Sequence, residues 1–235
     1  MMPPKLVVDG KLSVPLFHGT SSLFYDSILE TGLGGRNVVR HLGLRAIAQK
    51  ILTYEEQLAI VPAWAFEKRL LLEIAQDPSS QTPAVHGGFS FRYGSTCVTP
   101  SKQTAARYAL LNRGSEALAG TLRVLEALLD QLPKLTVDEQ FSKVLAFSSR
   151  SRIPILIEAH DVPEMFLRAE QGGPRGPVLE FIESALSDPE DYDTTVLQAN
   201  FELLRPIPAS QLQFYKIVSP QSGHDSLEDL GLKSL

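Results

Sequence analysis

A histidine, a glycine and a threonine stand together in the segment LFHGTSS (residues 16–22), where a short apolar run ends. A histidine ring forms hydrogen bonds through either nitrogen, glycine lets a ligand approach the main chain, and a threonine hydroxyl both donates and accepts. Together, these groups can grip a polar ligand at the carboxyl end of a strand. We therefore expect His18, Gly19 and Thr20 to lie in a binding site.

The surrounding residues predict the elements that hold this segment. Residues 16–20 are typical of a short apolar strand, and the apolar spacing after them predicts one amphipathic helix. Ser21 or Ser22 can cap that helix, and Gly32 suits the position just after its end. The sequence thus predicts a strand that ends in His-Gly-Thr and leads at once into a helix.

Two later segments each carry another candidate residue. Residues 88–100 predict a strand, a tight turn and a second strand, and the following helix, which Ser101 can cap, carries Tyr108. Residues 200–218 predict a strand, a proline-bounded turn and another strand, in a hairpin-like return. Glu202 lies in the first of these strands, among apolar residues, where a buried carboxylate without a purpose would be costly.

These three segments resemble the ADP-ribosyltransferase fold, in its diphtheria-toxin and poly(ADP-ribose)-polymerase-like branch. The segment LFHGTSSLFYDSILETGL is similar to the first motif of that family, YGSTCVTPSKQTAARYAL to the second, and residues 200–218 to the segment that holds the catalytic glutamate. The matches fall on His18, Tyr108 and Glu202, in the family's order. The resemblance spans roughly residues 14–218, and it implies an α+β fold in which two small antiparallel sheets enclose an NAD cleft.

The resemblance implies an NAD-dependent mono-ADP-ribosyltransferase, which moves ADP-ribose to a macromolecular acceptor and releases nicotinamide. His18 would bind the adenosine-side ribose, and the Gly19 backbone would hold the nicotinamide amide. Tyr108 would stack on the nicotinamide ring. Glu202 would stabilise the positive charge that develops on the ribose, bind a ribose hydroxyl and help to deprotonate the nucleophile. Protein is the favoured acceptor, and nucleic acid is possible but not favoured.

Other positions either support the cofactor or depart from the family pattern. Thr20 and Ser90 are further candidates for hydrogen bonds to the ribose and the nicotinamide. Cys97 stands about where many relatives carry an aromatic residue, so Tyr93 is the expected second wall beside the nicotinamide. Asn200 occupies a position at which arginine-modifying relatives carry Glu and several others carry Gln. The acceptor is therefore not indicated by this residue.

Two alternatives to an ADP-ribosyltransferase remain open. RNA 2′-phosphotransferases share the fold and also use NAD, but they need several arginines to clamp the 2′-phosphate. This chain has candidate arginines but no basic N-terminal domain. A binding module that keeps the fold without turnover is the second alternative, and the presence of both His18 and Glu202 counts against it.

The composition excludes several classes of protein. A formal net charge of −5 argues against a general nucleic-acid-binding surface, and 43% hydrophobic residues provide ample core. The single cysteine excludes an intrachain disulfide and a multi-cysteine metal site, and the histidines lack metal-ligand spacing, so we expect no metal. No apolar run is long enough to span a membrane, and the first residues lack the apolar core of a secretory signal. We expect a monomer that is cytoplasmic or is delivered into a host cell as an effector without such a signal.

The remaining segments predict the domain organisation. Periodic apolar residues predict helices in 42–76, which Pro62 would interrupt, and in 115–132, while residues 136–148 are ambiguous between a further helix and another structure; 42–76 and 115–148 are the expected helical insertions. Residues 153–160 predict a buried strand, residues 177–186 a short helix and residues 1–12 a loosely held arm. We therefore expect one catalytic domain over residues 1–235 with two helical insertions. Target recognition could lie in these insertions or in the loop at 77–87.

Overall fold

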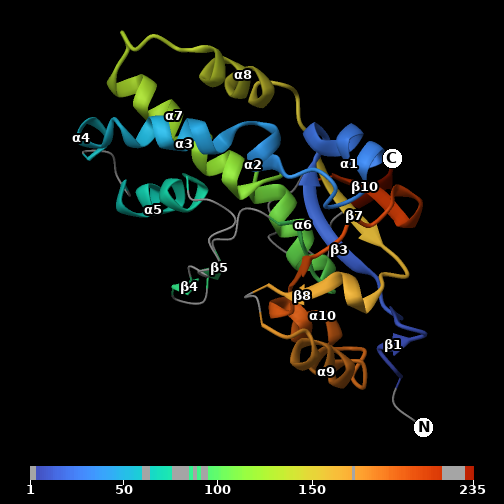
Figure 1. Cartoon of the computed structure of the whole chain (residues 1–235). Coiled ribbons are helices and arrows are strands. Elements are labelled where there is room, and N and C mark those ends of the chain that lie inside the picture. Colours follow the sequence, from blue (N-terminus) through green and yellow to red (C-terminus); the bar gives the residue numbers. More distant parts are fainter. Residues whose placement is uncertain are drawn as a thin grey trace. The chain divides into compact units, whose positions relative to one another are not determined.

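The computed structural model describes residues 4–59, 64–75, 85–86, 89–90, 95–170, 173–218 and 231–235, and it has mixed α+β architecture with small antiparallel sheets (Figure 1). The predicted α+β class is thus confirmed. The chain divides into two compact units. We call Met1–Arg36, Ser95–Gly114 and Arg152–Leu235 the strand unit, and Asn37–Gly94 and Ser115–Ser151 the helical unit. Both segments that were expected as helical insertions lie in the helical unit.

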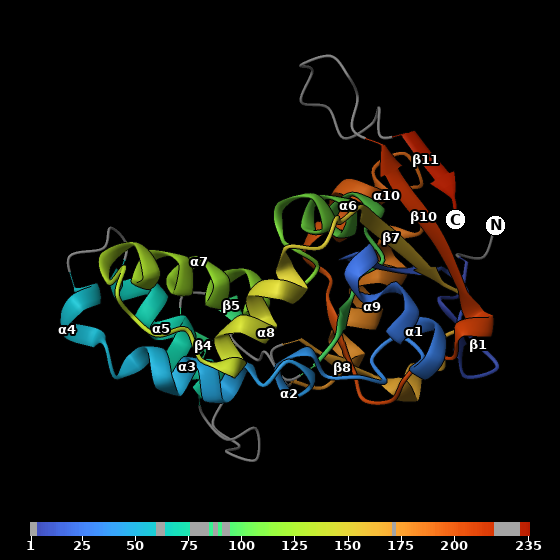
Figure 2. The same cartoon turned by 90° about the horizontal axis from the view of Figure 1, so that it is seen from above.

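The larger sheet of the strand unit has four antiparallel strands, and three of them run side by side in Figure 2. In spatial order they are β11 (Gly231–Ser234), β10 (Leu212–Val218), β7 (Pro154–Ala159) and β3 (Leu16–Ser21). The predicted strands at 16–20 and 153–160 are confirmed. β3 carries the His-Gly-Thr segment and forms one edge of this sheet.

The smaller sheet has three antiparallel strands in the order β6 (Cys97–Val98), β9 (Phe201–Leu203) and β8 (Leu167–Ala169). The predicted hairpin in 200–218 is wrong, because β9 and β10 belong to different sheets. The turn between them is held elsewhere: Ile207 exchanges two backbone hydrogen bonds with Leu33, at 2.8 and 3.0 Å. This bridge directs the chain out of one sheet and into the other.

Helix α6 (Lys102–Leu111) lies along β3 (Figure 1). It begins where expected, because the Ser101 hydroxyl accepts the Thr104 backbone N–H at 3.1 Å. Its small residues Ala105 and Ala109 are buried and face β3. This contact is close: a Cβ added to Gly19 would lie 1.9 Å from the Ala105 carbonyl oxygen. Only glycine lets the strand and the helix meet at this distance.

The first helix forms as predicted except at its start. A 3₁₀ turn (Ser22–Phe24) leads into α1 (Tyr25–Thr31), which ends at Gly32 with a φ of 80°. Neither Ser21 nor Ser22 caps it by a side-chain bond. The Ser22 hydroxyl instead accepts the backbone N–H of Ile153 at 2.9 Å. A tertiary contact with the segment that enters β7 thus replaces the local cap.

Residues 4–12 are packed rather than loose, which corrects the expectation of an arm for this part of 1–12; residues 1–3 lie outside the described residues. Its described part forms the hairpin β1 (Val7–Val8) and β2 (Lys11–Leu12), with Leu6 and Leu12 buried. The Leu12 backbone N–H donates to the Val162 carbonyl at 2.9 Å. Burial of two leucines holds the hairpin on the strand unit.

Short helices complete the strand unit. They are η2 (Glu164–Phe166), α9 (Gly176–Ala185), α10 (Tyr192–Thr195), η3 (Val196–Gln198) and η4 (Ala209–Gln211). The predicted helix at 177–186 is confirmed as α9. Helix η3 leads directly towards β9, and the Thr104 hydroxyl of α6 donates to the Leu197 carbonyl in η3 at 3.2 Å.

The helical unit confirms the periodic apolar pattern in both of its segments. Its elements are α2 (Val38–His41), α3 (Leu44–Leu52), α4 (Glu55–Leu58), α5 (Trp64–Ala75), β4 (Val85–His86), β5 (Phe89–Ser90), α7 (Glu116–Gln131) and α8 (Glu139–Ser148). Ser115 caps α7 as expected, since its hydroxyl accepts the Leu118 N–H at 3.4 Å. Within 88–100, where residues 91–94 lie outside the description, β5 pairs with β4, and β6 pairs with β9.

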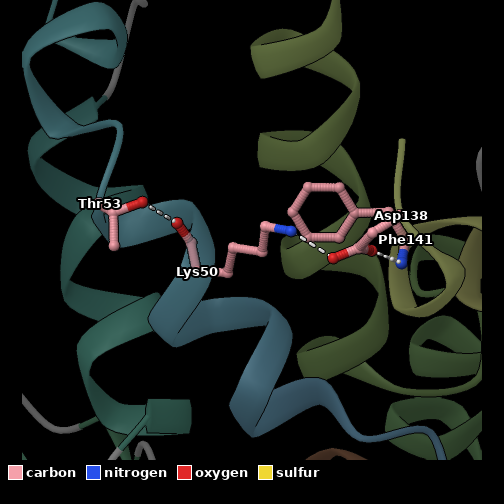
Figure 3. A network of polar contacts seen from close by, with 4 residues as sticks. All are labelled: Lys50, Thr53, Asp138 and Phe141. Carbon is pink, nitrogen blue, oxygen red and sulfur yellow. Dashed lines mark hydrogen bonds and ion pairs between the residues drawn. The ribbon is translucent and has the colours of Figure 1, made fainter. Parts of the chain in front are cut away.

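A polar network fixes the start of α8 (Figure 3). The Asp138 carboxylate accepts the Phe141 backbone N–H at 2.8 Å, which caps the helix. It also pairs with the ammonium of Lys50 from α3, and this ammonium lies 5.0 Å from the centre of the Phe141 ring. These contacts join α3 to α8 within the helical unit.

Candidate functional site

A backbone bridge joins the four-stranded sheet of the strand unit to the three-stranded sheet. Phe17 of β3 and Thr99 exchange both backbone hydrogen bonds, at 2.7 and 3.0 Å, in an isolated bridge. After this pair β3 stays with β7, and β6 stays with β9. The residues that directly follow Phe17 therefore lie where the sheets part.

His18 lies at this junction and connects the two sheets. Its ring Nδ1 is 2.7 Å from the Cys97 carbonyl oxygen. Because a carbonyl only accepts, Nδ1 carries the hydrogen, and the neutral ring then presents Nε2 as an acceptor. Burial lowers the pKa of His18, and the bond to Cys97 offsets part of that shift. The ring is therefore held neutral and is suited to accept a hydrogen bond from a ligand hydroxyl.

The backbone of Gly19 is directed towards the same junction. On an antiparallel strand the N–H and C=O of successive residues point to alternate sides. Since Phe17 bonds to Thr99 on the side of the smaller sheet, Gly19 points its N–H and C=O to that side as well. The position that a Cβ would take faces α6. Gly19 thus serves the packing of α6 and offers main-chain groups to a ligand.

Glu202 lies opposite Cys97 on the smaller sheet, and Arg168 lies opposite Glu202 on its other side. Directly paired residues share one face of a sheet, so these three side chains project together. The Glu202 residue is 7% exposed. Arg168 donates to one of its carboxylate oxygens from Nε at 2.9 Å and from Nη2 at 2.5 Å. The cost of burying this carboxylate is offset by the guanidinium.

A second carboxylate, Glu170, reaches the same face. Its carboxylate accepts hydrogen bonds from the side chains of Asn200 and Cys97. Burial raises the pKa of Glu170, the two hydrogen bonds oppose the rise, and the charge of Glu202 adds to it. The face thus carries two carboxylates, one arginine, one amide and one thiol.

Tyr108 lies on α6 rather than on a strand. It lies one helical turn after Thr104, whose hydroxyl bonds to the segment that leads to β9. Residues one turn apart share a helix face, so Tyr108 lies on the flank of α6 that faces η3. The side chain is half-buried.

Three further residues, Thr20, Ser90 and Tyr93, were predicted to contact the ligand. Thr20 is 2% exposed, and its hydroxyl donates to the Gly114 carbonyl at 3.3 Å, so it fastens β3 to the loop after α6. Ser90 lies on β5 in the helical unit, with its side chain outside the description, and Tyr93 lies outside the described residues. The structure therefore brings together His18, Gly19 and Glu202.

Arg168 and Glu170 were not among the site residues expected from the sequence. The alternation in Phe166-Leu167-Arg168-Ala169-Glu170 is a signal for a half-buried strand with polar residues on one face. β8 is only three residues long, and such short strands give a weak pattern. The pairing of Arg168 with Glu202 joins residues far apart in the chain and has no local signal.

No family model, curated protein or solved structure matches this chain. Among the residues that the structure describes, no group of three or more His, Cys, Asp and Glu side chains is placed to hold a metal ion. None of the helices in that part of the chain is long and apolar enough to cross a membrane. The site must therefore be interpreted from its own geometry.

The residues at the junction can orient a polar ligand, stabilise positive charge and exchange a proton. The neutral imidazole of His18 and the main-chain groups of Gly19 can orient a polar ligand from one sheet. The carboxylates of Glu202 and Glu170 can stabilise positive charge or exchange a proton from the other sheet. A ligand with hydroxyl groups and a centre that becomes positively charged during reaction suits such a site.

Proposed function

We propose that this chain is an NAD-dependent mono-ADP-ribosyltransferase with the ADP-ribosyltransferase-like fold. The observation that carries the proposal is the link between His18 and Glu202: the His18 ring bonds to the backbone of Cys97, and Cys97 is the cross-strand partner of Glu202. Two residues from opposite ends of the chain are thus each linked to Cys97 at the junction of two small sheets, which supports the proposal.

Each residue has a role that its surroundings support. His18 presents a neutral Nε2, which suits a hydroxyl of the adenosine-side ribose, and Gly19 offers a main-chain donor and acceptor to the nicotinamide amide. Tyr108 stacks on the nicotinamide ring. When the bond to nicotinamide breaks, the ribose gains positive charge, and the anion of Glu202 stabilises it most in that state.

The acceptor of ADP-ribose is a macromolecule, with protein favoured. The strand unit supplies the residues of the proposed cofactor site, while the helical unit contributes none of His18, Gly19, Tyr108 and Glu202. A separate helical unit is available for target recognition. NAD is the co-substrate, and the proposal assigns no metal to the reaction.

The test is incubation of the purified chain with labelled NAD, alone and with cell lysate. Glu202→Gln keeps the side-chain size and removes the charge, and Glu180→Gln, exposed on α9, is the matched control. We expect wild type and Glu180→Gln to release nicotinamide and label an acceptor, and Glu202→Gln to lose about 100-fold or more. Tyr108→Ala should weaken NAD binding by roughly 10-fold, and Tyr108→Phe should keep the ring and the affinity.

Other outcomes would contradict the proposal. Removal of a 2′-phosphate from an oligoribonucleotide in the presence of NAD, without labelling of protein, would make the chain a phosphotransferase. Binding of NAD without nicotinamide release would make it a binding module. Absence of NAD binding would reject the family assignment.

A further inference from the structure

Two carboxylates share one face of the smaller sheet. Glu202 is on β9, and Glu170 directly follows β8, two residues after Arg168. The backbone N–H of Glu170 donates to the Asn200 carbonyl at 3.2 Å, which extends the pairing of β8 with β9 by one residue. Side chains two residues apart on an extended strand point to the same face. Both carboxylates therefore lie on the face that carries Cys97.

The surroundings of the two carboxylates differ in charge. Glu202 faces the guanidinium of Arg168, which offsets its negative charge. Glu170 instead accepts hydrogen bonds from the neutral side chains of Asn200 and Cys97. Two neighbouring carboxyl groups with different surroundings are suited to different steps of one reaction, because one can stay charged while the other exchanges a proton.

We propose that Glu170 is the general base of this site and takes the proton of the incoming nucleophile while Glu202 stabilises the ribose. This inference rests on the function proposed above. In the step, an oxygen of the nucleophile forms a bond to C1′ of the ribose as the bond from C1′ to the nicotinamide nitrogen breaks. The bonding pair leaves with that nitrogen, which becomes neutral, and the proton passes to a carboxylate oxygen of Glu170.

This assignment narrows the acceptor chemistry. A hydroxyl group must lose a proton as it attacks, and a positioned base accelerates such a step by roughly 100-fold to 10,000-fold. A carboxylate acceptor carries no such proton and gains nothing from Glu170. The acceptor class that fits is therefore a group that loses a proton as it attacks, such as a hydroxyl group, and water is the simplest example and the probe of the test.

The first test measures nicotinamide release by the full chain with NAD and water as a function of pH. The wild-type rate should rise as Glu170 loses its proton, because burial raises the pKa of this carboxyl above its ordinary value of 4.5. Glu170→Gln should lower the rate about 100-fold and remove this rise. Glu170→Asp should restore part of both, and Glu180→Gln should change neither.

The other groups around Glu170 remain unchanged in these variants, so the profile reports on Glu170. The charged or titratable groups that lie on its face or at the junction are Arg168 on its own strand, Cys97 on β6, Glu202 on β9 and His18 on β3. Burial lowers the pKa of His18, so any step that His18 contributes should lie below 6.5 and persist in Glu170→Gln.

A second test needs no NAD. Cys97 is the single cysteine of the chain, so alkylation by iodoacetamide reports on one thiol. The Glu170 carboxylate accepts a hydrogen bond from this thiol, and its negative charge disfavours the reactive thiolate. Glu170→Gln should therefore raise the alkylation rate at neutral pH, whereas Glu180→Gln should leave it unchanged.

The outcomes separate this inference from the proposed function. If wild type turns over NAD, Glu202→Gln does not, and Glu170→Gln keeps the wild-type rate and profile, the function stands and the role of Glu170 is wrong. If alkylation of Cys97 is the same in Glu170→Gln, the contact on which the assignment depends is rejected. If wild type neither binds nor cleaves NAD, both proposals fail, because Glu170 then has no such reaction to serve.

Discussion

Arg168 donates to a single carboxylate oxygen of Glu202 from both Nε and Nη2, at 2.9 and 2.5 Å. The two residues are directly opposite on neighbouring strands, and the side chain of Glu202 is 9% exposed while that of Arg168 is 39% exposed. The arginine thus lies between the buried carboxylate and solvent. It holds the glutamate in place, while His18 makes its own contact with Cys97.

We expect this ion pair to contribute measurable coupling to stability. In a double-mutant cycle with Arg168→Met and Glu202→Gln, the coupling energy from urea unfolding should be about 1 kcal/mol, because solvent reaches Arg168 and weakens the pair. The Arg175–Glu164 pair, at 3.5 Å with both side chains at least one-third exposed, is the control and should show less coupling. Equal coupling for the two pairs would show that the burial of Glu202 has no energetic consequence.

The close contact between β3 and α6 leads to a second prediction. Gly19→Ala places a methyl group 1.9 Å from the Ala105 carbonyl oxygen, so α6 must shift, at a cost of about 2–3 kcal/mol of unfolding free energy. Gly173→Ala is the matched control, because a Cβ there meets no atom within 4 Å. Urea unfolding of both variants measures the difference. A neutral Gly19→Ala would mean that α6 does not pack on β3 as described.

Two of the three motif residues, His18 and Glu202, have a local signal in the sequence. A histidine before a glycine at the end of an apolar strand, and a glutamate within an apolar strand, stand out from their neighbours. The α6 start at Ser101 was likewise predictable, since a serine at that position satisfies the N–H of Thr104 within one turn. Helix α7 followed from its apolar period and from Ser115 in the same way.

The features that the sequence did not predict depend on long-range contacts. Ser22 has the residue type of a helix cap, but the Ile153 N–H competes for its oxygen once β3 and β7 pair. The exit of the chain from β9 depends on the bridge between Leu33 and Ile207, which no pattern near residue 207 reveals. Arg168 lies beside Glu202 because β8 pairs with β9. The sequence therefore indicated His18 and Glu202 but not the arginine beside Glu202.

The buried ring of His18 makes stability depend on pH. Burial lowers the pKa of His18 from 6.5, so the unfolded chain takes up a proton before the folded chain does. The unfolding free energy of the wild type should therefore fall relative to that of His18→Asn as the pH drops below 6.5. Above pH 6.5 the two free-energy curves should run parallel. Unfolding free energies across this range measure the difference. Curves that stay parallel below 6.5 would show that the ring is as easily protonated in the folded chain.

The network at the start of α8 allows a charge effect to be separated from a capping effect (Figure 3). The hydrogen bond from Lys50, and next the bond from the Phe141 N–H, hold the pKa of Asp138 below its ordinary value of 3.8. Asp138→Asn keeps an oxygen for the cap and loses the ion pair, whereas Asp138→Ala loses both. Amide exchange at Phe141 should therefore be slowest in wild type, intermediate in Asp138→Asn and fastest in Asp138→Ala.

The pH dependence of this network has a defined sign. Because the pKa of Asp138 is lower in the folded chain, its stabilising contribution is present above 3.8 and is lost as the pH falls through the folded value. The advantage of wild type over Asp138→Asn should disappear in that acidic range, and it should shrink at high salt, which screens the exposed pair. The advantage of Asp138→Asn over Asp138→Ala should persist under both conditions, since a neutral cap has no charge to lose. If acid instead removes both differences together, the cap and the ion pair act as one unit.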